Sequence, residues 1–320
     1  MSEHTAREWT VAEALPVLAL PRAYLPSGVE WGTLALTFGC YGGWLAALWL
    51  LPGVSLMLTL TVLVLLAALH SSLTHEALHG HPFRRAWANE ALMFLPLSLA
   101  VPYGRFRDTH LAHHRDERLT DPYDDPESNF LDPAVWAGLP RWKRRLHAVN
   151  NTLLGRIVLG PLIGQVAFLR GDWRLIRAGD RGVLRDWLLH LAGAAVVLGL
   201  VWLSPAPLWA VLLGAYGGLG LLKIRTFLEH RADEAAEGRS VVIEDRGLLA
   251  FLFLNNNLHA VHHRHPGVPW YALPRLYRAR RAAFLAANGG YVYRSYMEIF
   301  RNYLLRAKDP VPHPLWPRGE

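Results

Sequence analysis

The chain has 320 residues, of which 52% are hydrophobic and only 18% are charged, and its mean hydropathy is +0.14. This composition excludes a disordered chain and is too apolar for an ordinary soluble enzyme. The single cysteine, Cys40, excludes an internal disulfide, a cysteine zinc finger and a cysteine-ligated iron–sulfur cluster. The net charge of +7 would suit a nucleic-acid-binding protein, but the positions of the charges indicate a membrane instead, so we expect no nucleic-acid partner.

Two long uncharged segments predict membrane-spanning helices. Residues 31–70 and 187–222 contain no Asp, Glu, Lys or Arg, and each segment is too long for one span of about 20 residues. Turn residues interrupt both of them, at Leu51-Pro52-Gly53 and at Ser204 to Pro207. A soluble helical core is the alternative, but such cores rarely contain so long an uncharged run. We therefore predict an all-α membrane protein with four transmembrane helices arranged as two hairpins, near residues 31–51, 54–70, 187–203 and 208–228.

The distribution of positive charge predicts which side of the membrane each part faces. All Lys and Arg residues lie before, between or after the two uncharged segments, and neither hairpin turn is charged. By the positive-inside rule, we expect a multi-pass protein of the inner membrane with both termini in the cytoplasm. Residues 71–186 and 229–320 then form a cytoplasmic helical cap within a single domain, residues 1–320. Two shorter apolar stretches predict re-entrant or interface-lying helices, Ala91–Val101 and Ile157–Leu169.

Most of the 16 histidines fall into three clusters that predict a metal centre. One cluster is HxxxH, and two are HxxHH, in which helical spacing directs the imidazoles towards one region. All three clusters are expected on the cytoplasmic side, where His230 emerges from the fourth span. Imidazole binds iron, zinc or copper rather than magnesium or calcium, and nine imidazoles suit two ions. The candidate metal ligands are His75, His79, His110, His113, His114, His230, His259, His262 and His263.

In combination, these motifs resemble the membrane fatty acid desaturase and hydroxylase superfamily, and the likeness covers about residues 30–310. The local sequences HEALHGHP from His75, HLAHHRDE from His110 and NNNLHAVHH from Asn255 are similar to those of its bacterial desaturase-type branch. The resemblance implies that the nine histidines ligate two irons of a non-haem diiron centre with no separate catalytic residue. It also implies dioxygen as co-substrate and an external electron donor. One departure is Thr226, at the position where acyl-CoA desaturases carry an asparagine that contacts the centre through water.

Polar residues near the clusters are candidates for orienting the ligands. A ligating histidine usually donates its second ring N–H to a carboxylate or carbonyl. The acids among the candidates are equally compatible with solvated or helix-capping roles. His81 and His265 adjoin the clusters but break their spacing, so we expect neither to be a ligand. The orienting candidates are Glu76, Asp116, Asp121, Thr226, Glu229, Asn255 and Asn256.

The resemblance predicts an O2-dependent oxidoreductase that introduces a double bond, or a hydroxyl group, into an unactivated aliphatic chain of a lipid-like substrate. A hydroxylase, a ketolase and a fatty acid decarboxylase forming 1-alkenes are alternatives on the same scaffold. From another class, a membrane zinc metalloprotease would use HEALH as HExxH, but it would leave both HxxHH motifs without a role. A histidine-relay transporter would place its ligands near the bilayer midplane.

The expected partners follow from the same resemblance. They are an apolar acyl or alkyl substrate, membrane lipids, and a ferredoxin- or rubredoxin-like electron carrier with its reductase. An acidic carrier would dock on a basic cytoplasmic surface, whose other explanation is the positive-inside bias. The candidate docking residues are Arg105, Arg107, Arg278, Arg280 and Arg281.

Overall fold

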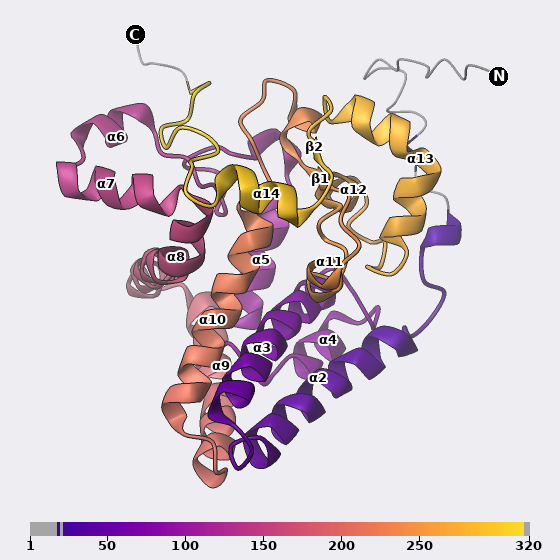
Figure 1. Ribbon diagram of the computed structural model, residues 1–320, viewed down its shortest axis with the longest axis vertical. Coiled ribbons are helices and arrows are strands. Elements are labelled where there is room, and N and C mark those ends of the chain that lie inside the picture. Colours follow the sequence, from indigo (N-terminus) through magenta and orange to yellow (C-terminus); the bar gives the residue numbers. More distant parts are fainter. Residues whose placement is uncertain (1–17, 20–21, 317–320) are drawn as a thin grey trace.

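The computed structural model describes residues 18–19 and 22–316, and helices dominate this part of the chain (Figure 1). The first half comprises η1 (Arg22–Tyr24), α2 (Trp31–Leu50), α3 (Leu56–Leu78), α4 (Ala86–Leu92), α5 (Tyr103–His113), η2 (Asp116–Arg118), α6 (Pro133–Gly138), α7 (Arg141–Asn150) and α8 (Leu153–Arg177). The second half comprises α9 (Arg181–Leu203), α10 (Leu208–Thr226), η3 (Ala236–Arg239), β1 (Val242–Ile243), α11 (Leu248–Leu252), α12 (His259–Arg264), α13 (Leu273–Ala287), β2 (Val292–Tyr293) and α14 (Tyr296–Tyr303).

Five of the described helices are long and apolar enough to cross a membrane: α2, α3, α8, α9 and α10. Four of them coincide with the four predicted spans. The fifth, α8, contains the stretch Ile157–Leu169, which we expected to be a short helix at the membrane interface. The helix is twice that length because its polar residues, including Arg156 and Asp172, extend it at both ends without interrupting the backbone hydrogen bonds. By length and composition, five of the described helices could cross a membrane, whereas the sequence predicted four transmembrane helices.

The other short apolar stretch, Ala91–Val101, is not a re-entrant helix. Helix α4 ends at Leu92, and the chain then runs through Pro96 and through Leu99, whose φ is 56°. Proline lacks the N–H that would continue a helix, and a left-handed residue breaks the helical path. The segment instead passes close to α9, where a Cβ placed on Gly193 would lie 2.2 Å from the Phe94 carbonyl oxygen.

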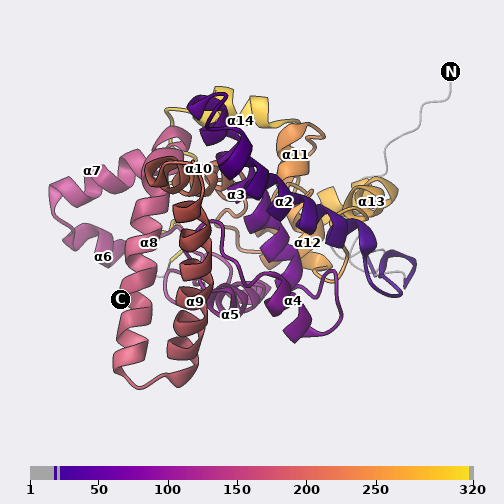
Figure 2. The same ribbon diagram turned by 90° about the horizontal axis from the view of Figure 1, so that it is seen from below.

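The predicted hairpins differ in how they pack. Helices α2 and α3 pack against each other, whereas α10 packs mainly against α3 and α8 and only slightly against its sequence neighbour α9. Glycines on α10 explain this preference. A Cβ on Gly218 would lie 2.6 Å from the Ala67 Cβ, so only a glycine permits this approach of α3. Small residues allow close approach between helices in membranes. Helices α9 and α10 are thus joined by a short turn but pack little against each other. Figure 2 shows α9 beside α8 instead.

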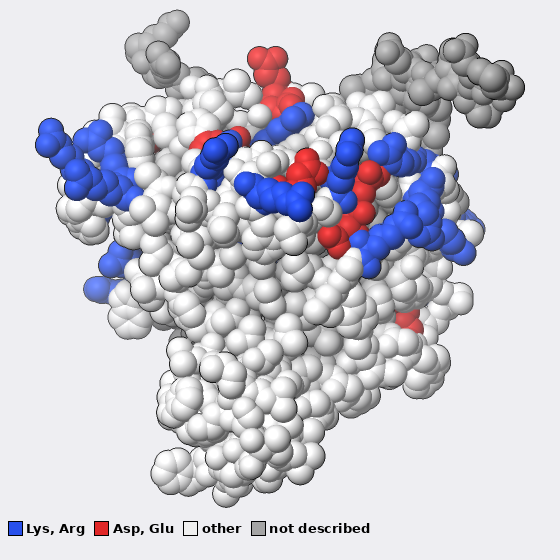
Figure 3. All heavy atoms as spheres, in the orientation of Figure 1, with Lys and Arg blue, Asp and Glu red and all other residues white. Residues whose placement is uncertain are grey.

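Charges are absent from the visible surface around the two uncharged turns. Figure 3 shows Lys and Arg gathered in the upper half of the molecule, while the lower end is uncharged. Large apolar side chains are exposed there, including Leu50, Met57, Trp202 and Leu203. An apolar surface of this size suits contact with lipid rather than water.

Helix α3 extends beyond its predicted span and carries the first histidine cluster into the protein. We expected the span to end at residue 70, but the helix continues to Leu78, with His75 and Glu76 buried. The tilt of Cβ atoms and the i, i+4 spacing place His75 and His79 on one side of its end. This end of α3 lies beneath α11 and α12 in Figure 1.

The segments after α10 are tied together by backbone hydrogen bonds. Strands β1 and β2 are parallel, and Val242 pairs with Val292. The Val241 N–H donates to the Glu229 carbonyl, and the Ala260 N–H donates to the Val241 carbonyl, at 3.0 and 2.9 Å. The β1 segment therefore lies between the chain leading to His230 and the start of α12, and it brings these two parts of the site together.

Helix α5, which carries the second cluster, is anchored to α8 and α9. The Arg105 guanidinium donates two hydrogen bonds, of 3.0 and 2.9 Å, to the buried Asp172 carboxylate. The Trp187 indole N–H donates to the same carboxylate at 2.9 Å. A bidentate pair of this kind has a defined geometry, so it restrains α5 relative to α8 and α9.

Candidate metal centre

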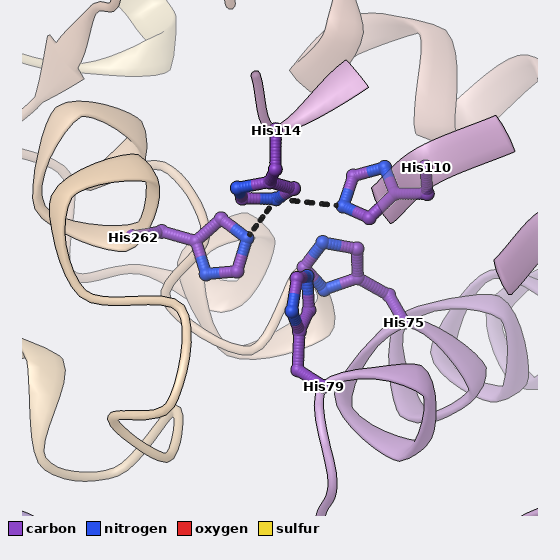
Figure 4. A group of neighbouring side chains, drawn as sticks. All are labelled: His75, His79, His110, His114 and His262. Carbon is purple, nitrogen blue, oxygen red and sulfur yellow. Dashed lines mark hydrogen bonds between the residues drawn. The ribbon is translucent and has the colours of Figure 1, made fainter. Parts of the chain in front are cut away.

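The nine histidines predicted as metal ligands meet in two adjacent groups. The five-histidine group comprises His75, His79, His110, His114 and His262 (Figure 4). The four-histidine group comprises His113, His230, His259 and His263. Within each group, one ring nitrogen from every residue lies within 4.8 Å of all the others. The rings of His114 and His263 stack with centroids 4.2 Å apart, so the two groups adjoin.

Each HxxHH motif contributes to both groups. At the end of α5, His110 and the capping residue His114 join the five-histidine group, and His113 joins the other. In α12 the arrangement is reversed, because His259 and His263 join the four-histidine group and His262 joins the five-histidine group. Residues four apart on a helix differ by about 40° in direction, whereas consecutive residues differ by about 100°. The spacing thus divides three imidazoles between two neighbouring positions.

The spacing of the ring nitrogens suits metal coordination. The His114 Nε2 lies 3.0 Å from the His110 Nε2 and 3.1 Å from the His262 Nε2. Likewise, the His230 Nε2 lies 3.0 Å from the His113 Nε2 and 3.1 Å from the His259 Nε2. Two nitrogens bound about 2.1 Å from one ion at a right angle are about 3.0 Å apart.

Other imidazole nitrogens face the same region without a hydrogen-bond partner. Within the described residues, the buried Nε2 atoms of His75 and His79 have none. Buried polar atoms are normally paired, and a metal ion that binds between such atoms is one standard reason for an exception. An all-imidazole donor set of this kind fits iron and other transition metals.

Acceptors behind the rings orient three of the histidines. The His113 Nδ1–H donates to the Asp125 carboxylate at 2.7 Å, and the His110 Nδ1–H donates to Glu127 at 2.8 Å. The His259 Nδ1 lies 3.1 Å from the Asn256 side-chain oxygen. These bonds place the proton on Nδ1 and leave Nε2 free to bind a metal. Asp125 and Glu127 were not predicted from the sequence, although the acidic run at residues 121–127 closely follows the second cluster.

Ser240 is a further contact that the sequence did not suggest. Its hydroxyl oxygen lies 3.2 Å from the His230 Nδ1. The backbones of the same two residues form an isolated β-bridge, so the contact depends on a tertiary pairing. No spacing pattern in the sequence would have revealed it.

Among the predicted orienting residues, Glu76 and Glu229 lie near the site but form other bonds. Glu76 accepts the Trp270 backbone N–H at 3.0 Å and lies 4.0 Å from the His75 Nδ1. Glu229 lies 3.1 Å from the Arg225 Nε and 3.6 Å from the His259 Nδ1. Of the residues predicted to orient a ligand, Glu76, Glu229 and Asn256 thus lie close to a histidine of the two groups.

The remaining predicted orienting residues have different surroundings. Asp121 accepts the backbone N–H groups of Tyr123 and Asp124, so it stabilises a turn. The Asn255 side chain donates to the Trp270 carbonyl oxygen. Thr226 lines a cavity beside the four-histidine group, and the Asp116 side chain lies outside the described part of the structure.

Burial and neighbouring carboxylates set the charge of the imidazoles. Burial lowers the pKa of His259 and His262 well below the usual value, so both rings are neutral at pH 7, the form that binds metals. Burial alone would lower the pKa of His113 too, but the Glu127 and Asp125 carboxylates outweigh it and raise this pKa to about 9. A metal binding at His113 therefore displaces a proton.

A cavity of about 890 Å³ adjoins the four-histidine group. Its lining includes His113, Glu127, Thr226 and His230, and it extends between α3, α4, α5, α8, α9 and α10. Cavities of this size hold small-molecule ligands or cofactors.

The apolar helices and the two histidine groups define a helical membrane protein with a transition-metal site. Residues 47–295 match the fatty acid desaturase family, and the chain belongs to that family. A comparison with curated proteins finds no match. Family membership and the histidine clusters together identify an oxidoreductase that binds metal and acts on a lipid substrate in a membrane.

Proposed function

We propose that this protein is an O2-dependent non-haem diiron enzyme that desaturates or hydroxylates an unactivated aliphatic chain of a lipid-like substrate. The observation that supports this proposal is the division of nine imidazoles into two adjacent groups beside a large cavity. The five-histidine group would hold one iron, and the four-histidine group would hold the other. All nine histidines would be ligands, as the three histidine motifs and the position of His230 suggest.

The chain itself would position the reactants and exclude water. When bound, two irons supply the reduction of dioxygen and the capacity to oxidise an unactivated C–H bond. Asp125 and Glu127 hold the imidazoles of His113 and His110 in the ligating tautomer. Walls such as Phe94, Phe168 and Leu189 would hold an aliphatic chain and limit the access of water. Placement of the chain would decide between desaturation, hydroxylation, ketolation and decarboxylation, and we favour desaturation.

In the membrane, α2, α3, α9 and α10 would be the four spans, and α8 would lie along the cytoplasmic interface. Both ends of α8 are positively charged, with Arg156 near one end and Arg170, Arg174 and Arg177 at the other. If α8 spanned the bilayer, one of these ends would face outward, contrary to the positive-inside rule. The termini and the metal centre would then face the cytoplasm of the inner membrane.

An acidic ferredoxin- or rubredoxin-like carrier, with its reductase, would deliver electrons to the basic surface of α13. Arg278 is exposed on this helix, whereas Arg281 pairs with Glu244. Arg105, which we expected on this surface, instead pairs with the buried Asp172 and cannot contribute to docking. Neutralising Arg278 should weaken the salt dependence of turnover with such a carrier.

The zinc protease alternative does not suit the surroundings of HEALH. A catalytic zinc ion keeps three protein ligands and an open position for water. Here His75 and His79 lie among three further imidazoles, and Glu76 accepts a hydrogen bond from Trp270. The five-imidazole group is therefore better explained by the oxidative function.

Mass spectrometry of lipids and small metabolites tests the proposed reaction directly. Cells producing the protein in air should contain a product that has lost two hydrogens or gained one oxygen relative to its precursor. The product should be absent without oxygen and in cells producing His262→Ala. It should remain with His313→Asn, because His313 lies outside both histidine groups. The proposal would be contradicted if the protein gave no oxygen-dependent product in the lipid extract of any host.

A further inference from the structure

The cavity beside the four-histidine group has two chemically different parts. Its apolar part is formed by side chains of α4, the segment that follows α4, α5, α8 and α9, among them Phe94, Phe168 and Leu189. Its polar part lies where α7 meets α8 and where the C-terminal segment passes. The polar lining there includes Asn129, Asn150, Asn151, Arg156, Lys223 and Lys308. A purely hydrocarbon substrate would not require this polar part.

Arg156 is a buried cation without a carboxylate partner among the described residues. Its side chain lies on α8 and the residue is only 6% exposed. Its Nε–H donates to the Asn150 carbonyl at 2.9 Å. Its two terminal nitrogens donate to the side-chain oxygens of Asn129 and, at 3.5 Å, Asn151. A guanidinium carries five N–H donors, so donors remain for a ligand and the positive charge is not neutralised by the protein.

Lys223 is a second unpaired cation in the same cavity. It lies near the end of α10 and is half-buried, and within the described part of the chain it forms no ion pair. It lies close enough to Arg156 for the two positive charges to repel each other. Two neighbouring cations in a partly dry cavity are unfavourable unless an anion lies between them.

Each carboxylate that lines the cavity is bonded to another residue, and none forms an ion pair with Arg156 or Lys223 within the described part of the chain, although Glu127 and Glu229 lie near enough to attract the Lys223 ammonium. Each accepts a hydrogen bond or forms an ion pair with a different residue. The pairs are Glu90 with Arg107, Asp125 with His113, Glu127 with His110, Asp186 with Arg185, Glu229 with Arg225, and Asp309 with Lys308. The charge of Arg156 is therefore not offset by a carboxylate of the described residues and is available to a bound molecule, and Lys223 adds a second positive charge nearby.

We propose that Arg156 and Lys223 bind the anionic head group, a carboxylate or a phosphate, of a single-chain amphiphilic substrate. The planar guanidinium matches either anion with two parallel hydrogen bonds, and the lysine adds a second point charge. The aliphatic part of the substrate then occupies the apolar part of the cavity. This inference rests on the proposed function and narrows its substrate class to anionic amphiphiles.

The position of Arg156 also links head-group binding to the metal centre. Its Cζ lies 6.0 Å from the centre of the Phe227 ring, three residues before His230. Its partner Asn129 lies two residues after Glu127, which orients His110. A head group held at Arg156 would thus be fixed relative to the imidazoles, and its distance from them would select the carbon that is oxidised.

Binding of three matched probes tests this site without any turnover. The metal-loaded protein, in nanodiscs of phosphatidylcholine and without a reductant, is titrated with hexadecanoate, hexadecyl phosphate and hexadecan-1-ol. At least one anion should bind about tenfold or more tightly than the alcohol, as expected for a charge-assisted contact. The tighter of the two anions identifies the head group as a carboxylate or a phosphate.

Variants show whether this preference comes from the two cations. Arg156→Gln and Lys223→Met should each remove most of the preference for the anion and leave the affinity for the alcohol unchanged. Arg156→Lys should retain part of it. Arg170→Gln is the matched control, because Arg170 is exposed on the same helix and does not line the cavity. Equal anion-to-alcohol ratios in the wild type and in both neutral variants would overturn the proposal.

The result can be separated from a failure of the proposed function. The probes are not oxidised under these conditions, so binding is measured independently of catalysis. If Arg156→Gln loses its metal through misfolding, Lys223→Met and Arg156→Lys still decide the question. A protein that shows no head-group preference but still oxidises lipids in cells would refute this inference alone.

Discussion

Replacing Asp125 with asparagine should weaken metal binding at the four-histidine group. The Asp125 carboxylate is buried, and it accepts the His113 Nδ1–H at 2.7 Å. It also accepts the backbone N–H groups of Glu127 and Thr120, both at 2.9 Å. Asparagine keeps one acceptor oxygen, so the loop can keep some of these bonds. It loses the negative charge that holds the His113 imidazole in its ligating tautomer.

The expected size of this effect follows from similar contacts behind metal ligands. Loss of such a contact typically lowers metal affinity 10- to 100-fold, which corresponds to about 1.4 to 2.7 kcal/mol. Because Asp125 contacts only His113 among the nine histidines, one of the two metals should be affected more strongly than the other. During titration with an iron chelator, Asp125→Asn should release about one iron per chain at concentrations that leave the wild type intact.

Asp121→Asn provides a matched control for this experiment. It makes the same chemical change four residues earlier in the same acidic run, but Asp121 accepts only backbone N–H groups of its own turn. Its iron affinity should equal that of the wild type. The reasoning would be refuted if Asp125→Asn kept both irons as tightly as the wild type, or if the two variants lost iron equally.

Three further predictions concern packing and topology. Gly218→Val should lower the thermal unfolding temperature and the iron content, because overpacking against α3 costs about 1–3 kcal/mol. Gly199→Ala is the control: Gly199 has open space around it, so this variant should keep the unfolding temperature and the iron content of the wild type. Asp172→Asn leaves the Arg105 charge unpaired and should destabilise the protein by about 3–5 kcal/mol in chemical unfolding, and a change below 1 kcal/mol would show that this anchor is dispensable. Tags at both termini should react only with cytoplasmic reagents, and labelling from outside would contradict the topology.

The membrane helices that could be predicted are those whose apolar runs are continuous. Helices α2, α3, α9 and α10 follow from long uncharged segments interrupted by proline-containing turns. Helix α8 could not be recognised at its full length, because Arg156 and Asp172 lie at helical positions that break the apolar run. Packing was not predictable either, since the preference of α10 for α3 depends on glycines whose neighbours only the folded chain reveals.

The metal centre shows the same division between local and tertiary information. Eight of the nine histidines could be selected by spacing, because i, i+3 and i+4 residues lie close together on any helix. His230 was selected by its position at the end of the fourth predicted span. Their division between two groups depends on how α5 and α12 face each other. Asp121 and Asp125 look equivalent in the sequence, yet a loop folds only Asp125 onto a histidine. Likewise, nothing in the sequence distinguishes the buried Arg156 from the exposed Arg170.

Locating iron in the purified protein tests the central claim most directly. Crystals of iron-loaded protein, measured at the iron absorption edge, should show two anomalous peaks per chain. One peak should lie among the five-histidine group and the other among the four-histidine group, each surrounded by imidazole nitrogens. A single peak, or iron bound away from these nine side chains, would contradict the diiron assignment.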